Sequence, residues 1–229
     1  MIHFPFRNWT TAIAAGALGV VAFTAWPSAG DPVGPRRFDS EPTARISMTA
    51  ASGTRAQPAE ARRSTVVAIG DSITYLSNAA IHASLEPVHA VEVNGIPGIE
   101  VAGQQAAASQ YARTQPDVVI INLGTNDVGA QRNPADVIGE LGAMASEFGS
   151  ASCVVFVTLT TQVVTDDFKQ RATEVNRWIR NQRHVADWDS ALTEADPLVR
   201  LTTDTVHPTA EGQLVMAQLI QRQVDACTV

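Results

Sequence analysis

From residue 64 onward, short continuous apolar runs alternate with longer amphipathic segments. The runs are rich in β-branched residues and resemble strands covered on both faces. They are Thr65–Ile69, His89–Val93, Asp117–Leu123, Cys153–Thr158 and Val185–Trp188. The segments with a helical pattern are Val101–Arg113, Pro134–Phe148 (with Asn133 as N-cap), Asp166–Gln182 and Ala210–Asp225. Strands that alternate with helices predict an α/β fold, a three-layer α/β/α sandwich around a central parallel five-stranded sheet.

The first 30 residues have the pattern of an export signal. Arg7 precedes the uncharged apolar run Ala12–Trp26, and small residues follow it. The run has about 15 residues, fewer than the roughly 20 that a helix needs to cross a bilayer. We therefore expect residues 1–30 to be a signal peptide cleaved near Ala29 or Gly30, which makes the protein secreted or associated with the cell envelope. An uncleaved anchor is the alternative, because the cleavage motif is imperfect.

Charge separates the rest of the chain into two parts. Residues 31–63 contain six arginines and four acidic residues among Pro, Ser, Thr and Ala without apolar periodicity, which is typical of a flexible linker. Residues 64–229 contain 9 basic and 19 acidic residues, a net charge of −10. Nucleic-acid binding depends on neutralising phosphates, so this acidic domain is not expected to bind nucleic acid.

Two cysteines, Cys153 and Cys227, occur in a chain that is expected to reach an oxidising compartment. Functional groups of parallel α/β sheets lie at the carboxyl ends of the strands. The last helix starts just beyond His207 and runs back, so Cys227 should reach the opposite edge, where Cys153 opens a strand. A disulfide would fit this topology, and two buried free thiols are the alternative.

Three motifs that follow predicted strands or precede the last helix contain groups suited to acyl chemistry. Gly70-Asp-Ser-Ile-Thr74 places Ser72 at a strand-to-helix turn, among N–H groups that suit an oxyanion. Gly124-Thr-Asn-Asp127 places the amide of Asn126 after another strand. Asp204-Thr-Val-His-Pro208 spaces Asp204 and His207 so that the carboxylate can orient the imidazole.

Each motif alone has a plain structural explanation: a helix N-cap, an Asx turn and a solvated loop histidine. Their occurrence together in one sheet weakens these explanations. Pro208 is expected to start the last helix. The two cysteines and the histidines lack zinc-ligand spacing, so no metal site is expected. Trp178 and Trp188 are expected in the core rather than in a cleft.

The chain resembles the SGNH (GDSL) hydrolases in these motifs, from about Thr65 to the C-terminus. Ser72, Asn126 and His207 match three blocks of the family, and Gly98 is preferred over Gly95 for the weaker glycine block. The resemblance implies a flavodoxin-like fold without a cofactor and a catalytic triad of Ser72, Asp204 and His207. It also implies an oxyanion hole formed by Ser72, Gly98 and Asn126. Asp71 and Asp127 are assigned to turn structure.

The resulting hypothesis is an exported serine esterase or lipase that hydrolyses acyl or acetyl esters through an acyl-enzyme on Ser72. An acyltransferase would use the same groups, and a non-catalytic envelope binding module is a further alternative. The expected partner is a small-molecule, lipid or acylated-sugar ester. Transient association with a membrane or cell wall would fit an exported monomer.

Overall fold

The computed structural model describes residues 62–163, 165–196 and 198–228. The predicted signal peptide and residues 31–61 of the predicted linker lie outside the described residues. Among the helices that the structure describes, none combines the length and the apolar character needed to cross a membrane.

A five-stranded parallel sheet forms the centre of the domain, with the strand order β2-β1-β3-β4-β5. The strands are β1 (Thr65–Gly70), β2 (Ala90–Gly95), β3 (Val118–Asn122), β4 (Cys153–Val157) and β5 (His184–Ala186). The order changes direction beside β1, as in flavodoxin-like sheets, and functional groups of such sheets are expected at the carboxyl ends of β1 and β3. In the register, Gly70 at the end of β1 is paired with Gly95 of β2 and Asn122 of β3.

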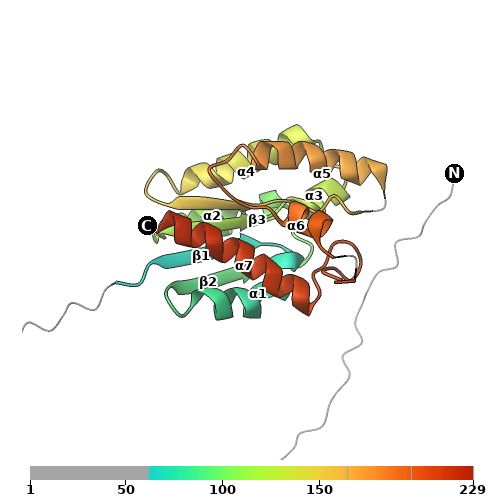
Figure 1. The fold of residues 1–229 in the computed structure, drawn as a ribbon. Helices are drawn as coiled ribbons and strands as arrows, with labels where there is room; N and C mark the ends of the chain where they lie inside the picture. The colour runs from blue at the N-terminus through green and yellow to red at the C-terminus, as the bar shows by residue number, and fades with distance from the viewer. Residues whose placement is uncertain (1–61, 164, 197, 229) are drawn as a thin grey trace, which may run out of the picture. The chain divides into compact units, whose positions relative to one another are not determined.

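Helices cover both faces of the sheet (Figure 1). Side chains alternate between the faces along each strand, so Val67 and Ile69 enter one core while Val66 and Ala68 enter the other. The first core is closed by α2 (Val101–Ala112), α4 (Pro134–Glu147) and α5 (Asp166–Ile179). The second is closed by α1 (Ser72–Leu85), α6 (Trp188–Glu194) and α7 (Ala210–Cys227). The predicted three-layer α/β/α sandwich is confirmed.

The helix ends follow local capping groups. The predicted N-cap Asn133 accepts a hydrogen bond from the backbone N–H of Ala135 at 2.9 Å, as expected. Two predictions about element ends were wrong, one at the end of β5 and one, on the role of Pro208, at the start of α7. The fifth strand stops at Ala186 and not at Trp188, because the Asp187 side chain caps α6 and makes Trp188 its first residue.

Both predicted core tryptophans pack inward: Trp188 is 1% exposed, and Trp178 packs edge-on against Phe156.

Pro208 does not start the last helix. Thr209 caps α7 by accepting from the Gly212 N–H at 3.1 Å, and α7 begins at Ala210. Pro208 instead pairs with Thr202 in an isolated antiparallel bridge. The chain around His207 is therefore a closed loop and not a helix start. A short helix, α3 (Thr125–Gly129), also follows β3 where only a turn was expected.

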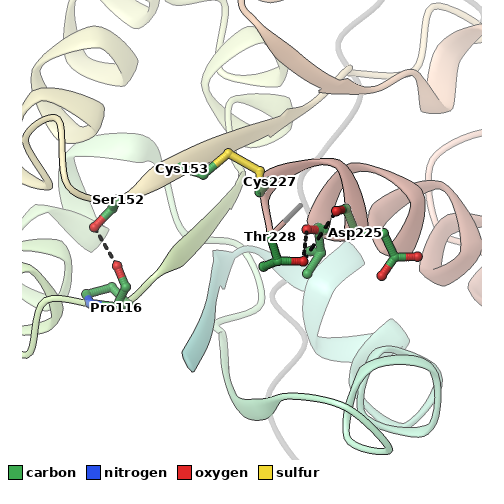
Figure 2. The surroundings of a disulfide bond; sticks show 7 residues. Pro116, Ser152, Cys153, Asp225, Cys227 and Thr228 are labelled. Carbon is green, nitrogen blue, oxygen red and sulfur yellow. Dashed lines mark hydrogen bonds between the residues drawn. A yellow bond between two sulfur atoms is a disulfide. The ribbon is translucent and has the colours of Figure 1, made fainter. Parts of the chain in front are cut away.

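A disulfide joins Cys153 at the start of β4 to Cys227 at the end of α7, with 5.9 Å between the Cα atoms (Figure 2). Helix α7 ends at the edge of the sheet where β1 begins (Figure 1). The topological argument for a disulfide at the edge opposite the carboxyl ends is thereby confirmed.

Candidate active site

Ser72 is the first residue of α1, directly after β1. The fully buried Asp71 caps this helix, because its Oδ1 accepts from the Ile73 N–H at 2.9 Å. A serine in this position lies at the positive end of the helix dipole, among backbone N–H groups that have no partner within the helix. The strand end and the cap together fix the direction in which the Ser72 hydroxyl leaves the backbone.

Ser72, His207 and Asp204 form a continuous hydrogen-bonded row. The Ser72 Oγ and the His207 Nε2 are 3.0 Å apart, and the His207 Nδ1 and the Asp204 Oδ2 are 2.7 Å apart. Because a carboxylate accepts at Nδ1, that nitrogen carries the proton and Nε2 has a free lone pair toward Ser72. The structure thus brings together the three residues that the sequence singled out.

The Asp204 carboxylate also shapes its own loop. Its Oδ1 accepts from the backbone N–H of His207 at 2.7 Å and of Val206 at 3.2 Å. Partial burial raises the pKa of this carboxyl. The hydrogen bonds from the His207 backbone and ring and from Val206 outweigh burial and hold its pKa below the ordinary value. Asp204 is therefore ionised at neutral pH, as an acceptor for the imidazole must be.

Asn126 follows the carboxyl end of β3, in α3, and its side chain reaches the Asp71 cap of α1. Its Nδ2 donates to the Ile99 carbonyl at 2.8 Å and to the Asp71 Oδ2 at 3.3 Å. Both protons of the amide are thus directed at protein acceptors. The longer bond to Asp71 is the weaker one, so a stronger acceptor such as an oxyanion would compete for that proton.

The two candidate glycines have different structural roles. Gly95 ends β2 against α1: a Cβ atom there would lie 2.4 Å from the backbone nitrogen of Tyr75, so this position needs glycine for close packing. Gly98 has φ 77° and open space around the position of a Cβ. It directly precedes Ile99, whose carbonyl binds Asn126. Gly98 therefore lies in the segment that contacts the site, and Gly95 supports the helix that starts at Ser72.

Two buried carboxylates do more than form turns. Burial raises the pKa of Asp71 to about 6, although the Ile73 N–H favours its charged form. Asp127 accepts from the Val101 N–H at the start of α2, at 3.1 Å, and from the Arg132 Nη1 at 2.7 Å. Burial also raises the pKa of Asp127, against the opposing effect of these two donors. Asp127 thereby joins the segment after β2 to the segment after β3.

Arg132 was missed by the sequence reasoning. It follows the Asn126 motif and bonds to both Asp127 and, with two nitrogens at 2.8 and 2.6 Å, to Glu140. Its position in sequence is that of an ordinary surface arginine, and no spacing pattern marks it. Only the folded chain shows that it holds a buried carboxylate.

The opposite edge of the sheet holds a second cluster of reactive groups. The candidate ligand atoms of Cys153, Cys227 and His184 lie within 4.8 Å of one another, although their sequence spacing gave no sign of this. Both sulfurs are bonded to each other in the disulfide, so neither is a thiolate that could bind a metal. A hollow of about 710 Å³ opens beside them and is also lined by Asp117. Neither Ser72 nor His207 lines it, so this hollow is not part of the site.

Comparisons with known proteins agree with this geometry. Residues 68–215 match the model of the GDSL-like Lipase/Acylhydrolase family. Comparison with curated proteins returned no match. Among solved structures, a lipolytic protein of the G-D-S-L family from Veillonella parvula has a TM-score of 0.59 and 22% identity, covering 69% of this chain and 96% of the other.

Two further solved structures carry more specific names. The catalytic domain of peptidoglycan O-acetyltransferase A from Streptococcus pneumoniae has a TM-score of 0.59 and 17% identity, covering 72% of this chain and 94% of the other. The acetyl xylan esterase AlAXEase has a TM-score of 0.58 and 17% identity, covering 70% and 99%. At these identities the likeness concerns the fold.

Because the family model covers more than half of the sequence, the chain belongs to the GDSL-like lipase/acylhydrolase family. The protein is therefore an SGNH ester hydrolase, a class of enzyme that acts on small-molecule esters. The resemblance read from the motifs around Ser72, Asn126 and His207 is confirmed.

Proposed function

We propose that this protein is an exported serine esterase that cleaves accessible short-chain acyl esters, acetyl esters above all, through an acyl-enzyme on Ser72. The observation that carries the proposal is the 3.0 Å contact between the Ser72 Oγ and the His207 Nε2, with Asp204 on the far side of the ring. This is the arrangement that nucleophilic acyl transfer by serine requires.

In the first half of the reaction, the Ser72 oxygen attacks the carbonyl carbon of the ester while its proton passes to the His207 Nε2. Asp204 keeps the proton on Nδ1 and stabilises the imidazolium that forms. The tetrahedral intermediate then collapses, the bond to the alcohol oxygen breaks, and the proton on Nε2 passes to the leaving alkoxide. Water repeats these steps on the acyl-enzyme and regenerates the Ser72 hydroxyl.

The negative oxygen of the intermediate needs hydrogen-bond donors close to Ser72. We assign this role to the backbone N–H groups of Ser72 and Gly98 and to the Asn126 amide. As charge develops on the oxygen, it competes with the Asp71 carboxylate for the weaker hydrogen bond of Asn126, which is 3.3 Å long. The donor is therefore more useful in the transition state than in the ground state, as catalysis requires.

Two observations support short acyl groups on accessible substrates. The 710 Å³ hollow that could house a long chain is bordered by residues of the opposite edge and not by Ser72. Solved structures of the same fold include an acetyl xylan esterase and a peptidoglycan O-acetyltransferase. Acetylated polymers outside the cell would be reachable for an enzyme with the predicted export signal.

The decisive experiment is covalent labelling of the purified protein with a fluorophosphonate probe, followed by mass spectrometry of the labelled peptide. Labelling at Ser72 in the wild type, and none in Ser72→Ala, is expected from an activated nucleophile. A series of p-nitrophenyl esters should show the highest kcat/KM for acetate or butyrate. Absence of labelling at Ser72 would reject the acyl-enzyme, and a preference for long chains would reject the substrate assignment. An added alcohol acceptor separates hydrolysis from acyl transfer, because only transfer yields a new ester.

A further inference from the structure

The loop that carries Asp204 and His207 closes mostly on itself. At its base, the Thr209 N–H donates to the Leu201 carbonyl at 2.9 Å, and nearer the tip the Thr203 N–H donates to the His207 carbonyl at 2.8 Å. The tip contains Thr205, whose φ is 73°. A β-branched residue rarely adopts this left-handed conformation, so surrounding contacts must hold it there.

Thr160 supplies such a contact from another part of the fold. Its side chain is fully buried, and its hydroxyl donates to the Thr205 carbonyl at 3.1 Å while it accepts from the Gln162 N–H at 3.1 Å. Among the described residues, this is the hydrogen bond that reaches residues 204–206 from outside the loop. The hydroxyl therefore contacts the strained residue that lies next to Asp204.

The backbone around Thr160 is unusually well anchored. Leu159, the preceding residue, exchanges two hydrogen bonds with the buried Asn176 side chain of α5, at 2.8 and 2.7 Å. Thr161, the following residue, gives its N–H and its hydroxyl to the Asp189 Oδ1 of α6, both at 2.7 Å. Satisfied buried networks of this kind are rigid. Both neighbours of Thr160 in the chain are thus held in place, and the Thr160 hydroxyl contacts the loop from this rigid segment.

We propose that Thr160 is a positioning residue for the catalytic histidine. Its hydroxyl holds the Thr205 carbonyl, keeps the tip in its left-handed conformation, and so keeps Asp204 and His207 at hydrogen-bonding distance from each other and from Ser72. This role rests on the proposed function of His207 as the base. Misplacement of a catalytic group by about 1 Å can cost on the order of 10²-fold in rate, so loss of the hydroxyl should reduce kcat and not substrate affinity.

The test compares Thr160→Val with Thr158→Val. Thr158 is an equally buried threonine of the same segment. Its hydroxyl also accepts one hydrogen bond, from the Asp189 N–H, and donates one, to Asp187, but it makes no hydrogen bond to the loop among the described residues. On p-nitrophenyl acetate, Thr160→Val should lower kcat by about 10- to 100-fold with KM nearly unchanged, whereas Thr158→Val should stay within about threefold of wild type. Equal kcat values in the two variants would overturn the proposal.

A second pair of variants separates the hydroxyl from the volume of the side chain. Thr160→Ser keeps the donor and should retain kcat within about threefold, while Thr160→Ala should behave like Thr160→Val. The proton on the His207 Nδ1 gives a spectroscopic check by NMR: its low-field signal should persist in Thr160→Ser and in Thr158→Val and broaden in Thr160→Ala. Loss of activity in Thr160→Ser, or an unchanged signal in Thr160→Ala, would contradict the positioning role.

The strain at Thr205 allows a double-mutant cycle. Glycine adopts a positive φ without strain, so a loop with Thr205→Gly depends less on the hydroxyl of Thr160. The kcat of the double variant Thr160→Val/Thr205→Gly should therefore be at least about threefold higher than that of Thr160→Val. Strict additivity would contradict the inferred route through Thr205. If instead the wild type proves inactive or Ser72→Ala proves active, the proposed function fails, and that result is distinct from an active, Ser72-dependent wild type with an unaffected Thr160→Val.

Discussion

The two edges of the sheet hold their groups together in different ways. At the carboxyl edge, Ser72, Asn126 and His207 come from distant segments and are joined by hydrogen bonds and buried carboxylates. At the opposite edge, a covalent bond joins Cys153 to Cys227 beside an open hollow. The hollow of about 710 Å³ is at the edge without a nucleophile. Chemistry in this fold is therefore indicated by the convergence of polar groups at the strand exits and not by the size of a hollow.

The difference has a physical cause. All carboxyl ends of parallel strands meet at one edge, where the following helices offer their N–H groups. A nucleophile and an oxyanion benefit from that environment, whereas a disulfide only needs two cysteines at the correct separation. Substitutions at the two edges should thus affect different quantities: turnover at the carboxyl edge and stability at the opposite edge.

The largest expected effect is that of Ser72→Ala. Without the nucleophile, kcat on p-nitrophenyl acetate should fall by on the order of 10⁶, to the background that oriented donors alone provide. Because the hydrogen-bond partner of the Ser72 hydroxyl, His207, is itself partly exposed, the melting temperature should hardly change. A variant that retains a tenth of the activity would refute the mechanism.

The double substitution Cys153→Ser/Cys227→Ser addresses the opposite edge. The disulfide closes a loop of 74 residues, which the chain-entropy model values at up to about 4 kcal/mol of unfolding free energy. Urea denaturation should reveal that loss, while kcat at room temperature should remain within about twofold of wild type. A large drop in kcat would mean that the two edges are coupled through α7, and it would contradict the separate effects of the two edges on turnover and on stability.

Asn126→Ala sharpens the comparison within the carboxyl edge. Removal of one oxyanion donor should lower kcat by roughly 10² to 10³ and leave KM nearly unchanged, because the donor acts mainly in the transition state. Asn133→Ala is a matched control: it removes the cap of α4 and should cost about 1 kcal/mol of stability without an effect on kcat. Similar kinetics for the two variants would argue against the oxyanion role.

The smallest predicted effect is a pH dependence that originates in Asp71. Its pKa is raised from 3.8 to about 6 in the folded protein, so the folded state binds this proton more tightly than the unfolded state. The protonated Asp71 carboxyl therefore stabilises the folded state fully below about pH 4. This contribution to the free energy of unfolding, about 3 kcal/mol in total, is lost as the pH rises toward 6. Asp71→Asn cannot titrate and should lack this loss.

Urea denaturation of the wild type and of Asp71→Asn between pH 4 and pH 7 measures the effect. The stability of the wild type relative to the variant should fall with rising pH and level off above about pH 6. Other carboxylates cancel in the difference, including Asp204, whose lowered pKa acts in the opposite direction. Parallel curves would show that Asp71 is not the titrating group.

Much of the fold was predictable because the strands are short apolar runs with clear ends. All five predicted strands and the four predicted helices are present, with ends shifted by three residues or fewer. The errors occurred where a polar side chain decides the end of an element. Asp187 starts α6 at Trp188, and Thr209, not Pro208, precedes α7, whose predicted start at Ala210 is confirmed. The pattern of hydrophobic and polar residues does not predict such local hydrogen bonds.

The supporting residues of the site were not predictable in this way. Arg132, Thr160 and Asn176 lie in segments with no recognisable motif, and each becomes important through a partner far away in sequence. Asp71 and Asp127 were noticed but assigned to turns, because burial is not visible in the local spacing.

The sequence by itself determined the sandwich, the family and the identity of the groups suited to ester chemistry, because periodicity and short motifs are local properties of the chain. Only the tertiary structure decided that Ser72 and His207 are 3.0 Å apart, that Cys153 bonds to Cys227, and that a buried threonine supports the histidine loop. These facts depend on distances between segments up to 135 residues apart, and packing in three dimensions sets those distances.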